Sequence, residues 1–382
     1  MRFFEFYQSN SIPLMEGARI QHAEDIVFWE GSNGAVRAVE ALKNLEKGSH
    51  IDVTIKWDGS PAIIFGRDEN GNFILTDKSG FTAKGYDGRS TSPKDLEKML
   101  LNRKLSRGVD PDDNYRQFAG NMRDIFDEYE KATPKDHRGF FKGDLLYYNT
   151  PLLAKGTFTF KPNVVTYTVD AQSTLGKKIA MSKTGVVIHN EIDLNGNDVP
   201  LDINPETYFK GTEVLVVPPV TVSAAPQVDD TDIKNLQEII SKNRAGIDQI
   251  LDKNILAKLK ISDLPNIFYT YLNSKVDTGM ENLGSDFFSW LSNSKVSKAK
   301  QGKIVEFLGN NKAGFDSLWL VVSGIQTVKN DIIDQFESQD APVKSYINDN
   351  PGGEGFVLNH SDGAIKLVNR AGFTAANRNI ER

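Results

Sequence analysis

The order of secondary-structure patterns constrains the fold of this chain of 382 residues more than any single motif does. β-type patterns dominate up to about residue 217, a helical pattern runs from about 230 to 348, and short β-patterns return after 354. Within 312–337, apolar residues repeat mostly every three or four positions, which is typical of an amphipathic helix. A helical segment inserted between strands of one sheet explains this order better than two domains in series. We therefore expect two lobes, or one core with a large insertion.

Composition excludes several classes of protein. The chain has no cysteine, which rules out disulfides, thiol catalysis and cysteine metal sites. No apolar run reaches membrane-spanning length, and Met1–Tyr7 lacks the apolar run of a signal peptide. We therefore expect no membrane partner and a cytoplasmic location, in the host cytoplasm if the protein is viral. The five histidines show no metal-ligand spacing, so no zinc site is predicted.

Hydrophobic periodicity and turn residues predict the individual elements. The first 34 residues are expected to form an irregular arm with a short strand or turn at Ile26-Val27-Phe28. Helices are predicted at 35–46, 93–103 and 113–131, and a glycine-rich loop at 79–92. Strands are predicted at 51–57, 62–66, 73–77, 140–147, 164–169, 185–189, 213–217, 355–358 and 364–368.

A net charge of −6 argues against a general nucleic-acid coat but does not exclude local contact with phosphates. The segment from Lys78 to Arg107 is locally basic. Two interpretations stay open for this segment. It is either a solvated face beside a helix or a surface that guides a nucleic acid.

Lys56-Trp57-Asp58-Gly59 joins two apolar strands and is the strongest candidate for chemistry. An Asp-Gly pair between strands is first of all a hairpin signal. The same arrangement can also place a lysine amine at a sheet edge, where flanking apolar residues desolvate it. Desolvation lowers a lysine pKa, and only the neutral amine is a nucleophile.

Four further segments supply what attack on a nucleotide α-phosphate requires. They are Lys78-Ser79-Gly80, Gly143-Asp144-Leu145, Glu354-Gly355-Phe356-Val357 and Lys366 within an apolar strand. The two carboxylates can hold a metal ion or a ribose, and a lysine can neutralise phosphate charge. Each also has a structural interpretation, as a turn carboxylate facing water or as an edge-strand lysine that prevents aggregation.

In this order the five segments resemble motifs I, Ia, III, IV and V of the covalent nucleotidyltransferases, which include ATP-dependent DNA ligases, RNA ligases and mRNA capping enzymes. The Lys-x-Asp-Gly-Ser form looks most like certain phage RNA ligases. The whole chain also looks like uncharacterised proteins of large tailed phages with a similar Lys-Trp-Asp-Gly-(Ser/Ala)-Pro-Ala segment. The motif resemblance covers about 50–217 and 350–370 and leaves the helical segment outside.

The resemblance implies a role for each matched residue. Lys56 would form the lysyl-nucleotide phosphoramidate and Lys366 would contact the α-phosphate, which makes them the catalytic pair. Asp144 and Glu354 would lie at the Mg²⁺ ion. The other expected nucleotide-binding residues are Thr54, Ile55, Asp58, Gly59 and Lys78, with Tyr167, or else Phe160, stacking on the base.

This sequence departs from the family pattern at three places. Asp144 stands where motif III usually has glutamate, so its carboxylate has a shorter reach. Pro61 replaces an arginine often found after Lys-x-Asp-Gly, and Arg67 is a candidate substitute. Motif V has Lys366 without a second lysine two residues away.

The expected fold is α+β: a nucleotidyltransferase domain of the ATP-grasp-like ligase adenylation type, with antiparallel sheets, flanking helices and a large all-α insertion. Its N-terminal part would span 1–228, the insertion 229–348 and its C-terminal part 349–382. The expected function is an ATP- and Mg²⁺-dependent polynucleotide ligase, acting on RNA in preference to DNA. Two alternatives stay open: a nucleotidyltransferase with a non-ligase acceptor, and a non-catalytic phage virion or binding protein on the same fold.

Overall fold

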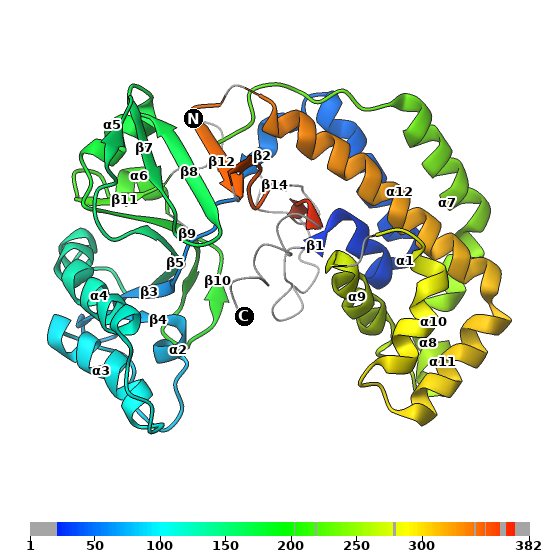
Figure 1. Ribbon diagram of the computed structural model, residues 1–382, viewed down its shortest axis with the longest axis horizontal. Helices are drawn as coiled ribbons and strands as arrows, with labels where there is room; N and C mark the ends of the chain where they lie inside the picture. Colours follow the sequence, from blue (N-terminus) through cyan, green and yellow to red (C-terminus); the bar gives the residue numbers. More distant parts are fainter. Residues whose placement is uncertain are drawn as a thin grey trace.

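Two lobes flank a small central sheet in the computed structural model (Figure 1). The structure describes residues 21–370 except 202, 218, 219, 278, 279, 340, 348 and 360–363. One lobe is rich in β-strands and the other is helical, so the molecule is a mixed α/β protein with mostly antiparallel sheets. Among its described helices, none is long and apolar enough to cross a membrane.

The largest sheet of the β-rich lobe has the strand order β10-β9-β5-β3-β4, and β11 pairs with β9 in parallel. Helices α3 and α4 contribute Leu100 and Phe126 to a core that also holds Phe65 and Phe141. The elements of this part are β3 (Ala62–Arg67), β4 (Phe73–Asp77), α2 (Lys78–Phe81), α3 (Pro93–Leu105), α4 (Asp113–Ala132), β5 (Gly139–Tyr147), β9 (Thr184–Ile192), β10 (Asp198–Val199), α6 (Pro205–Tyr208) and β11 (Val214–Val216).

A second antiparallel sheet of this lobe has the order β13-β12-β8-β7-β6. Its strand β12 follows the helical segment in sequence and pairs with β8, so the chain returns to the β-rich lobe after leaving it. The elements are β6 (Leu153–Ala154), β7 (Thr157–Phe160), β8 (Val165–Asp170), α5 (Thr174–Ala180), β12 (Val343–Ile347) and β13 (Asn350–Pro351).

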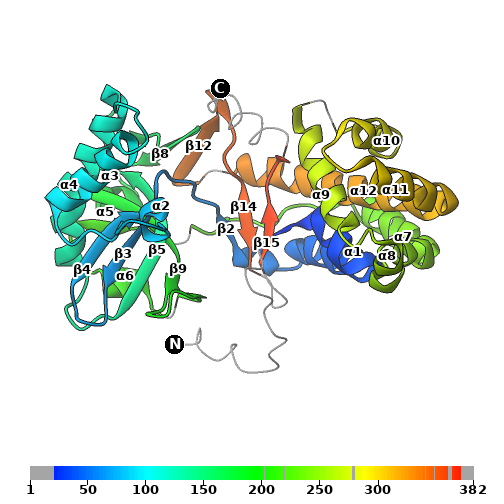
Figure 2. The same ribbon diagram turned by 90° about the horizontal axis from the view of Figure 1, so that it is seen from below.

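The central sheet joins distant parts of the chain in the order β1-β15-β14-β2, with β1 parallel to β15 (Figure 2). One of its faces packs against the helical lobe, because Phe356, Leu358, Ile365 and Leu367 belong to the same buried core as the helices. Side chains alternate along a strand, so Lys366 and its register partner Val357 belong to the opposite face. The strands are β1 (Gln21–His22), β2 (Val53–Ile55), β14 (Phe356–Leu358) and β15 (Ile365–Leu367).

The helical lobe is built around the long helix α12, which packs against both α7 and α1 (Figure 1). Its apolar stripe, including Phe315, Val322 and Ile332, is buried as the sequence predicts. The elements are η1 (Ala23–Asp25), α1 (Ile26–Glu46), η2 (Ser49–Asp52), α7 (Asp230–Ile250), α8 (Lys253–Leu259), α9 (Leu264–Ser274), η3 (Lys275–Asp277), α10 (Leu283–Asn293), α11 (Lys298–Asn310) and α12 (Lys312–Glu337).

Most predicted strands and helices are present. The helical segment expected up to 348 ends at Glu337, because 343–347 form strand β12, and the loop expected at 79–92 begins with helix α2. The prediction for the N-terminal arm is also wrong. Residues 26–28 begin helix α1 and form neither a strand nor a turn. The helix contains Gly31 in a non-helical conformation, and this break hides a continuous helical pattern from sequence reasoning. Helix α1 also packs against α7, so the helical lobe includes a segment from the N-terminal region. The first 20 residues of the expected arm lie outside the described residues.

A buried cluster of four charged side chains joins three distant segments of the chain. Lys329 on α12 donates to both carboxylate oxygens of Glu24, at 2.8 and 2.9 Å. Arg370 donates to Asp25 at 2.6 Å and also lies 3.3 Å from Glu24. Burial alone would raise the pKa of Glu24, but Lys329 and Arg370 lower it to about 2, so this carboxylate is ionised. Each charge in the cluster therefore depends on its partners to offset desolvation.

Replacing Lys329 with methionine should strongly destabilise the fold. The change leaves Glu24 as a buried carboxylate without its ammonium partner, and such losses cost about 3–5 kcal/mol in the free energy of unfolding. Urea denaturation measures the difference. Lys242→Met, which removes an exposed pair with Glu238, is the control and should cost less than about 1 kcal/mol. Equal effects of the two substitutions would contradict the role assigned to the buried cluster.

Candidate active site

Lys56 lies directly after strand β2, and the pairing of β2 with β14 determines its neighbour. Ile55 is opposite Phe356, and the Lys56 backbone N–H donates to the Gly355 carbonyl at 2.9 Å. This pairing brings the Lys56 ammonium into an ion pair with Glu354 Oε1. Both side chains are largely buried, with exposed fractions of 19% for Lys56 and 13% for Glu354. The structure thus brings together the predicted nucleophile and the predicted motif IV acid.

Close backbone contacts explain the glycine of the Lys-x-Asp-Gly segment. After Lys56 the chain crosses to β5, where the Ser60 N–H donates to the Leu145 carbonyl at 2.9 Å. A Cβ atom on Gly59 would lie 2.5 Å from that carbonyl oxygen and 2.8 Å from the Cβ atom of Asp144. Any side chain at this position would therefore separate residues 56–59, the Lys56 loop, from the strand that carries Asp144.

Asp58 is held beside Lys56 by contacts at both its backbone and its carboxylate. Its backbone N–H donates to the Tyr167 hydroxyl at 2.8 Å, and its carboxylate accepts from the Asn163 amide. Burial raises the pKa of the neighbouring Glu354 carboxyl, and the negative charge of Asp58 raises it further. Burial raises the pKa of Asp58, whereas the positive charge of Lys56 opposes that rise. Acidic groups therefore surround the amine at close range, and their ionisation is interdependent.

The two predicted base-stacking residues lie in an aromatic cluster with Trp57. The rings of Phe160 and Trp57 are stacked, with centroids 6.4 Å apart, and Tyr167 lies 4.8 Å from Trp57. Tyr167 is fully buried, so its hydroxyl reaches the site through Asp58 while its ring packs in the core. In this arrangement the cluster supports the backbone of the Lys56 loop. Base stacking by Tyr167 or Phe160 stays a prediction.

Asp144 has a partner that sequence reasoning missed. On the neighbouring strand β9, His189 Nε2 lies 2.9 Å from Asp144 Oδ2, and the histidine is about half exposed. The pairing depends on an irregularity in the β5–β9 register next to Asp144, which local sequence patterns do not reveal. The pair extends the polar surface of the site beyond the short aspartate side chain.

The other predicted residues lie at different distances from this centre. Lys366 is close enough to lower the pKa of Glu354 by its charge. Thr54 and Ile55 are the last residues of β2. Lys78 is exposed at the start of α2, where its charge acts on Asp198.

Arg67 is not a substitute for the missing motif I arginine. Its buried guanidinium donates to four backbone carbonyls, those of Gly71, Glu130, Thr133 and Pro134.

Glu354 is the acid of the site with an unusually high pKa. Burial raises its pKa to about 7, while the positive charge of Lys56 acts in the opposite direction. Its Oε2 atom is buried and has no hydrogen-bond partner. An orphaned carboxylate oxygen of this kind fits a cation that binds with a substrate.

Within the described residues, no group of three metal-ligating side chains lies close together. Mg²⁺ commonly binds through one or two carboxylates together with substrate phosphates, so Asp144 and Glu354 remain compatible with it.

The chain belongs to a family described as a family of unknown function (DUF6267), which matches residues 18–382. Comparison with curated proteins and with solved structures gave no match. Family membership therefore assigns no activity, and the functional argument depends on the geometry around Lys56.

The raised pKa of Glu354 predicts a specific pH dependence of stability. The folded protein holds this proton up to about pH 7, whereas an unfolded chain releases it near the ordinary value of 4.5. Rising pH between these values therefore favours unfolding. The stability of the wild type relative to Glu354→Gln should fall across this window, as measured by melting temperature. Glu238→Gln, at an exposed position, is the control. If the difference in melting temperature between the wild type and Glu354→Gln does not change with pH, the assignment is wrong.

Proposed function

We propose that this protein is a covalent nucleotidyltransferase, and specifically an ATP-dependent polynucleotide ligase that acts on RNA in preference to DNA. The observation that carries the proposal is the contact between Lys56 and Glu354, with Asp58 close enough for its charge to act on the Glu354 carboxyl. The residues lie in the order expected for motifs I and IV, and they come together from opposite ends of the chain. The mixed α/β architecture is compatible with a ligase adenylation domain that carries a helical insertion.

The ion pair indicates how the nucleophile would be activated. A lysine in an ion pair is protonated, so the amine must lose a proton before it can attack. Glu354 Oε1 contacts this amine, and a pKa of about 7 suits a group that accepts a proton near neutral pH. The neutral Lys56 nitrogen would then form a bond to the α-phosphorus of ATP while the bond to the pyrophosphate oxygen breaks. The products are lysyl-AMP and pyrophosphate.

Other residues of the site would bind and orient the reactants. Asp144 and the free Oε2 atom of Glu354 would hold Mg²⁺, which when bound would neutralise phosphate charge. Lys366, on the face of the central sheet away from the helical core, would neutralise charge at the α-phosphate. Asp58, fixed by Tyr167 and Asn163, would keep the Lys56 loop in place. Ligation would follow when AMP passes to a 5′-phosphate end and a 3′-hydroxyl displaces it.

Incubation with α-labelled ATP and Mg²⁺ should give an acid-labile labelled protein. Lys56→Ala and Lys56→Arg should abolish the label, because alanine removes the amine and arginine is not a nucleophile at neutral pH. Lys242→Ala, at an exposed helix position, should label like the wild type. A wild type without label, or a labelled Lys56→Ala variant, would overturn the proposal. Label without joining of RNA ends would instead indicate a non-ligase acceptor.

The Asp144–His189 pair predicts a compensating substitution. If His189 extends the reach of Asp144 toward the nucleotide, His189→Ala should raise the ATP concentration needed for half-maximal labelling by about tenfold, the effect of losing one hydrogen bond to a charged group. The double variant Asp144→Glu/His189→Ala should recover part of the loss, because glutamate is longer. His50→Ala is the control. Unchanged labelling by His189→Ala would remove this residue from the site.

A further inference from the structure

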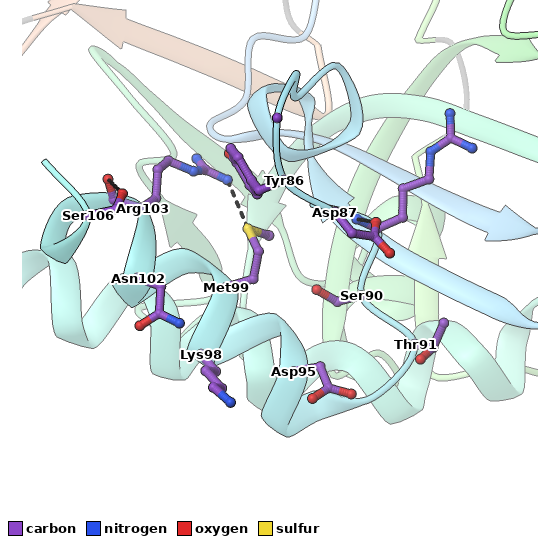
Figure 3. Close-up of a pocket in the computed structure, with 12 residues that line it drawn as sticks. Tyr86, Asp87, Ser90, Thr91, Asp95, Lys98, Met99, Asn102, Arg103 and Ser106 are labelled. Carbon is purple, nitrogen blue, oxygen red and sulfur yellow. Dashed lines mark hydrogen bonds between the residues drawn. The ribbon is translucent and has the colours of Figure 1, made fainter.

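A pocket lies in the β-rich lobe, between helix α3 and the loop that precedes it (Figure 3). It has a volume of about 570 Å³, which is within the usual range for a ligand site. Tyr86 and Ser90 line it from the loop, and Lys98, Met99, Asn102 and Arg103 line it from the helix. None of these residues belongs to the Lys56 site, so the pocket requires its own explanation.

The lining combines an exposed aromatic ring with hydrogen-bonding groups and cations. Tyr86 is 44% exposed, and Figure 3 shows its ring beside the Arg103 side chain. The side chains of Asn102 and Lys98 are carried one turn apart on α3. Proteins that bind single-stranded nucleic acids use this combination, in which a ring stacks on a base, amides bind base edges and cations bind phosphates.

Arg103 gives an independent indication of a ligand. Its terminal nitrogens form two short bonds with Asp77, at 2.6 and 2.7 Å, and its Nε atom is buried without a hydrogen-bond partner. A buried donor is normally satisfied, because desolvating it without an acceptor is costly. The guanidinium is therefore fixed in place by Asp77 and by Met99 Sδ, while its buried Nε donor has no acceptor.

The acidic residues that line the pocket are already engaged. Asp95 accepts a hydrogen bond from Ser92 at the start of α3, and Asp87 accepts from the Arg89 backbone N–H. Arg89 lies over the Phe81 ring at 4.3 Å. These contacts fix the side chains in the walls of the pocket, and Arg89, Lys98 and Arg103 supply the positive charges of its lining.

Asp77, the ion-pair partner of Arg103, relates the pocket to the candidate active site through the largest sheet. This residue ends β4 opposite Ile63, and the adjacent residue Ala62 is opposite Asp144 on β5. The strands β4, β3 and β5 are neighbours, so Asp77 and Asp144 are separated by two strand spacings, roughly 10 Å. Side chains alternate along a strand, so the Asp77 side chain lies on the face of the sheet that packs against α3 and α4, and the Asp144 side chain lies on the opposite face.

We propose that this pocket binds one unpaired nucleotide of a single-stranded RNA, with the base on Tyr86 and an acceptor atom at Arg103. The assignment of RNA as a substrate of the Lys56 site rests on the proposed function, whereas binding in the pocket does not require catalysis. The basic segment from Lys78 to Arg107 thus acquires a specific role as a nucleic-acid surface centred on this pocket.

Fluorescence anisotropy with a labelled single-stranded RNA oligonucleotide tests the proposal. Tyr86→Ala should weaken binding by about tenfold, within the range for loss of one base-stacking contact, and Tyr86→Phe should retain binding because the ring remains. Lys98→Ala should weaken binding more than Lys94→Ala, which alters the same helix outside the pocket. Single-stranded DNA of the same sequence shows whether the ribose hydroxyl contributes.

The outcomes separate this inference from the proposed function. If Tyr86→Ala binds RNA as tightly as the wild type while labelling at Lys56 proceeds, the pocket inference is wrong and the nucleotidyltransferase proposal stands. If the wild type binds RNA through Tyr86 but takes up no label from ATP, the pocket inference stands and the proposed activity is wrong. If Tyr86→Ala weakens the binding of duplex RNA as much as that of single-stranded RNA, the pocket does not select an unpaired nucleotide and the inference is wrong.

Discussion

The antiparallel pairing of β2 with β14 is the interaction on which the candidate site depends. It places Ile55 opposite Phe356, and the next residues along each strand bring the Lys56 amine to the Glu354 carboxylate. Gly355 has a φ of +100°, and a Cβ atom there would lie 2.3 Å from the Leu367 carbonyl oxygen. The glycines at 59 and 355 therefore have the same purpose, because each lets two chain segments approach closely enough for their functional side chains to meet.

Electrostatic interactions make the site distinct from an ordinary surface ion pair. Lys56 is close to both Glu354 and Asp58, and burial raises the pKa of each of these carboxyl groups. A group of acids that ionise less readily around one amine is costly for stability, and such arrangements occur preferentially at functional sites. In the Glu24 cluster, in contrast, two cations contact Glu24, and Arg370 also contacts Asp25, whose pKa burial raises to about 6.

The parts of the fold that follow from local patterns were predictable from the sequence. The strands β3, β4 and β5 and the helices α3, α4 and α12 have clear periodicity and recognisable caps, such as Ser92 before Pro93. The order of the motif residues also indicated that Lys56 and Glu354 belong to one site. His189 could not be predicted as a partner of Asp144, because their contact depends on strand register. Lys329 could not be predicted as a buried cation, because only the distant Glu24 makes its burial possible.

The arrangement of the chain also determines when the site can form during protein synthesis. β2 emerges early from the ribosome, but its partner β14 and the buried Arg370 are among the last described residues to be made. Until then Lys56 lacks Glu354, and the edge of β2 that later pairs with β14 is open. The largest sheet is completed by residues up to 216 and does not depend on this late segment. Assembly of the candidate site is therefore a late, non-local step, and non-local pairings of this kind form slowly.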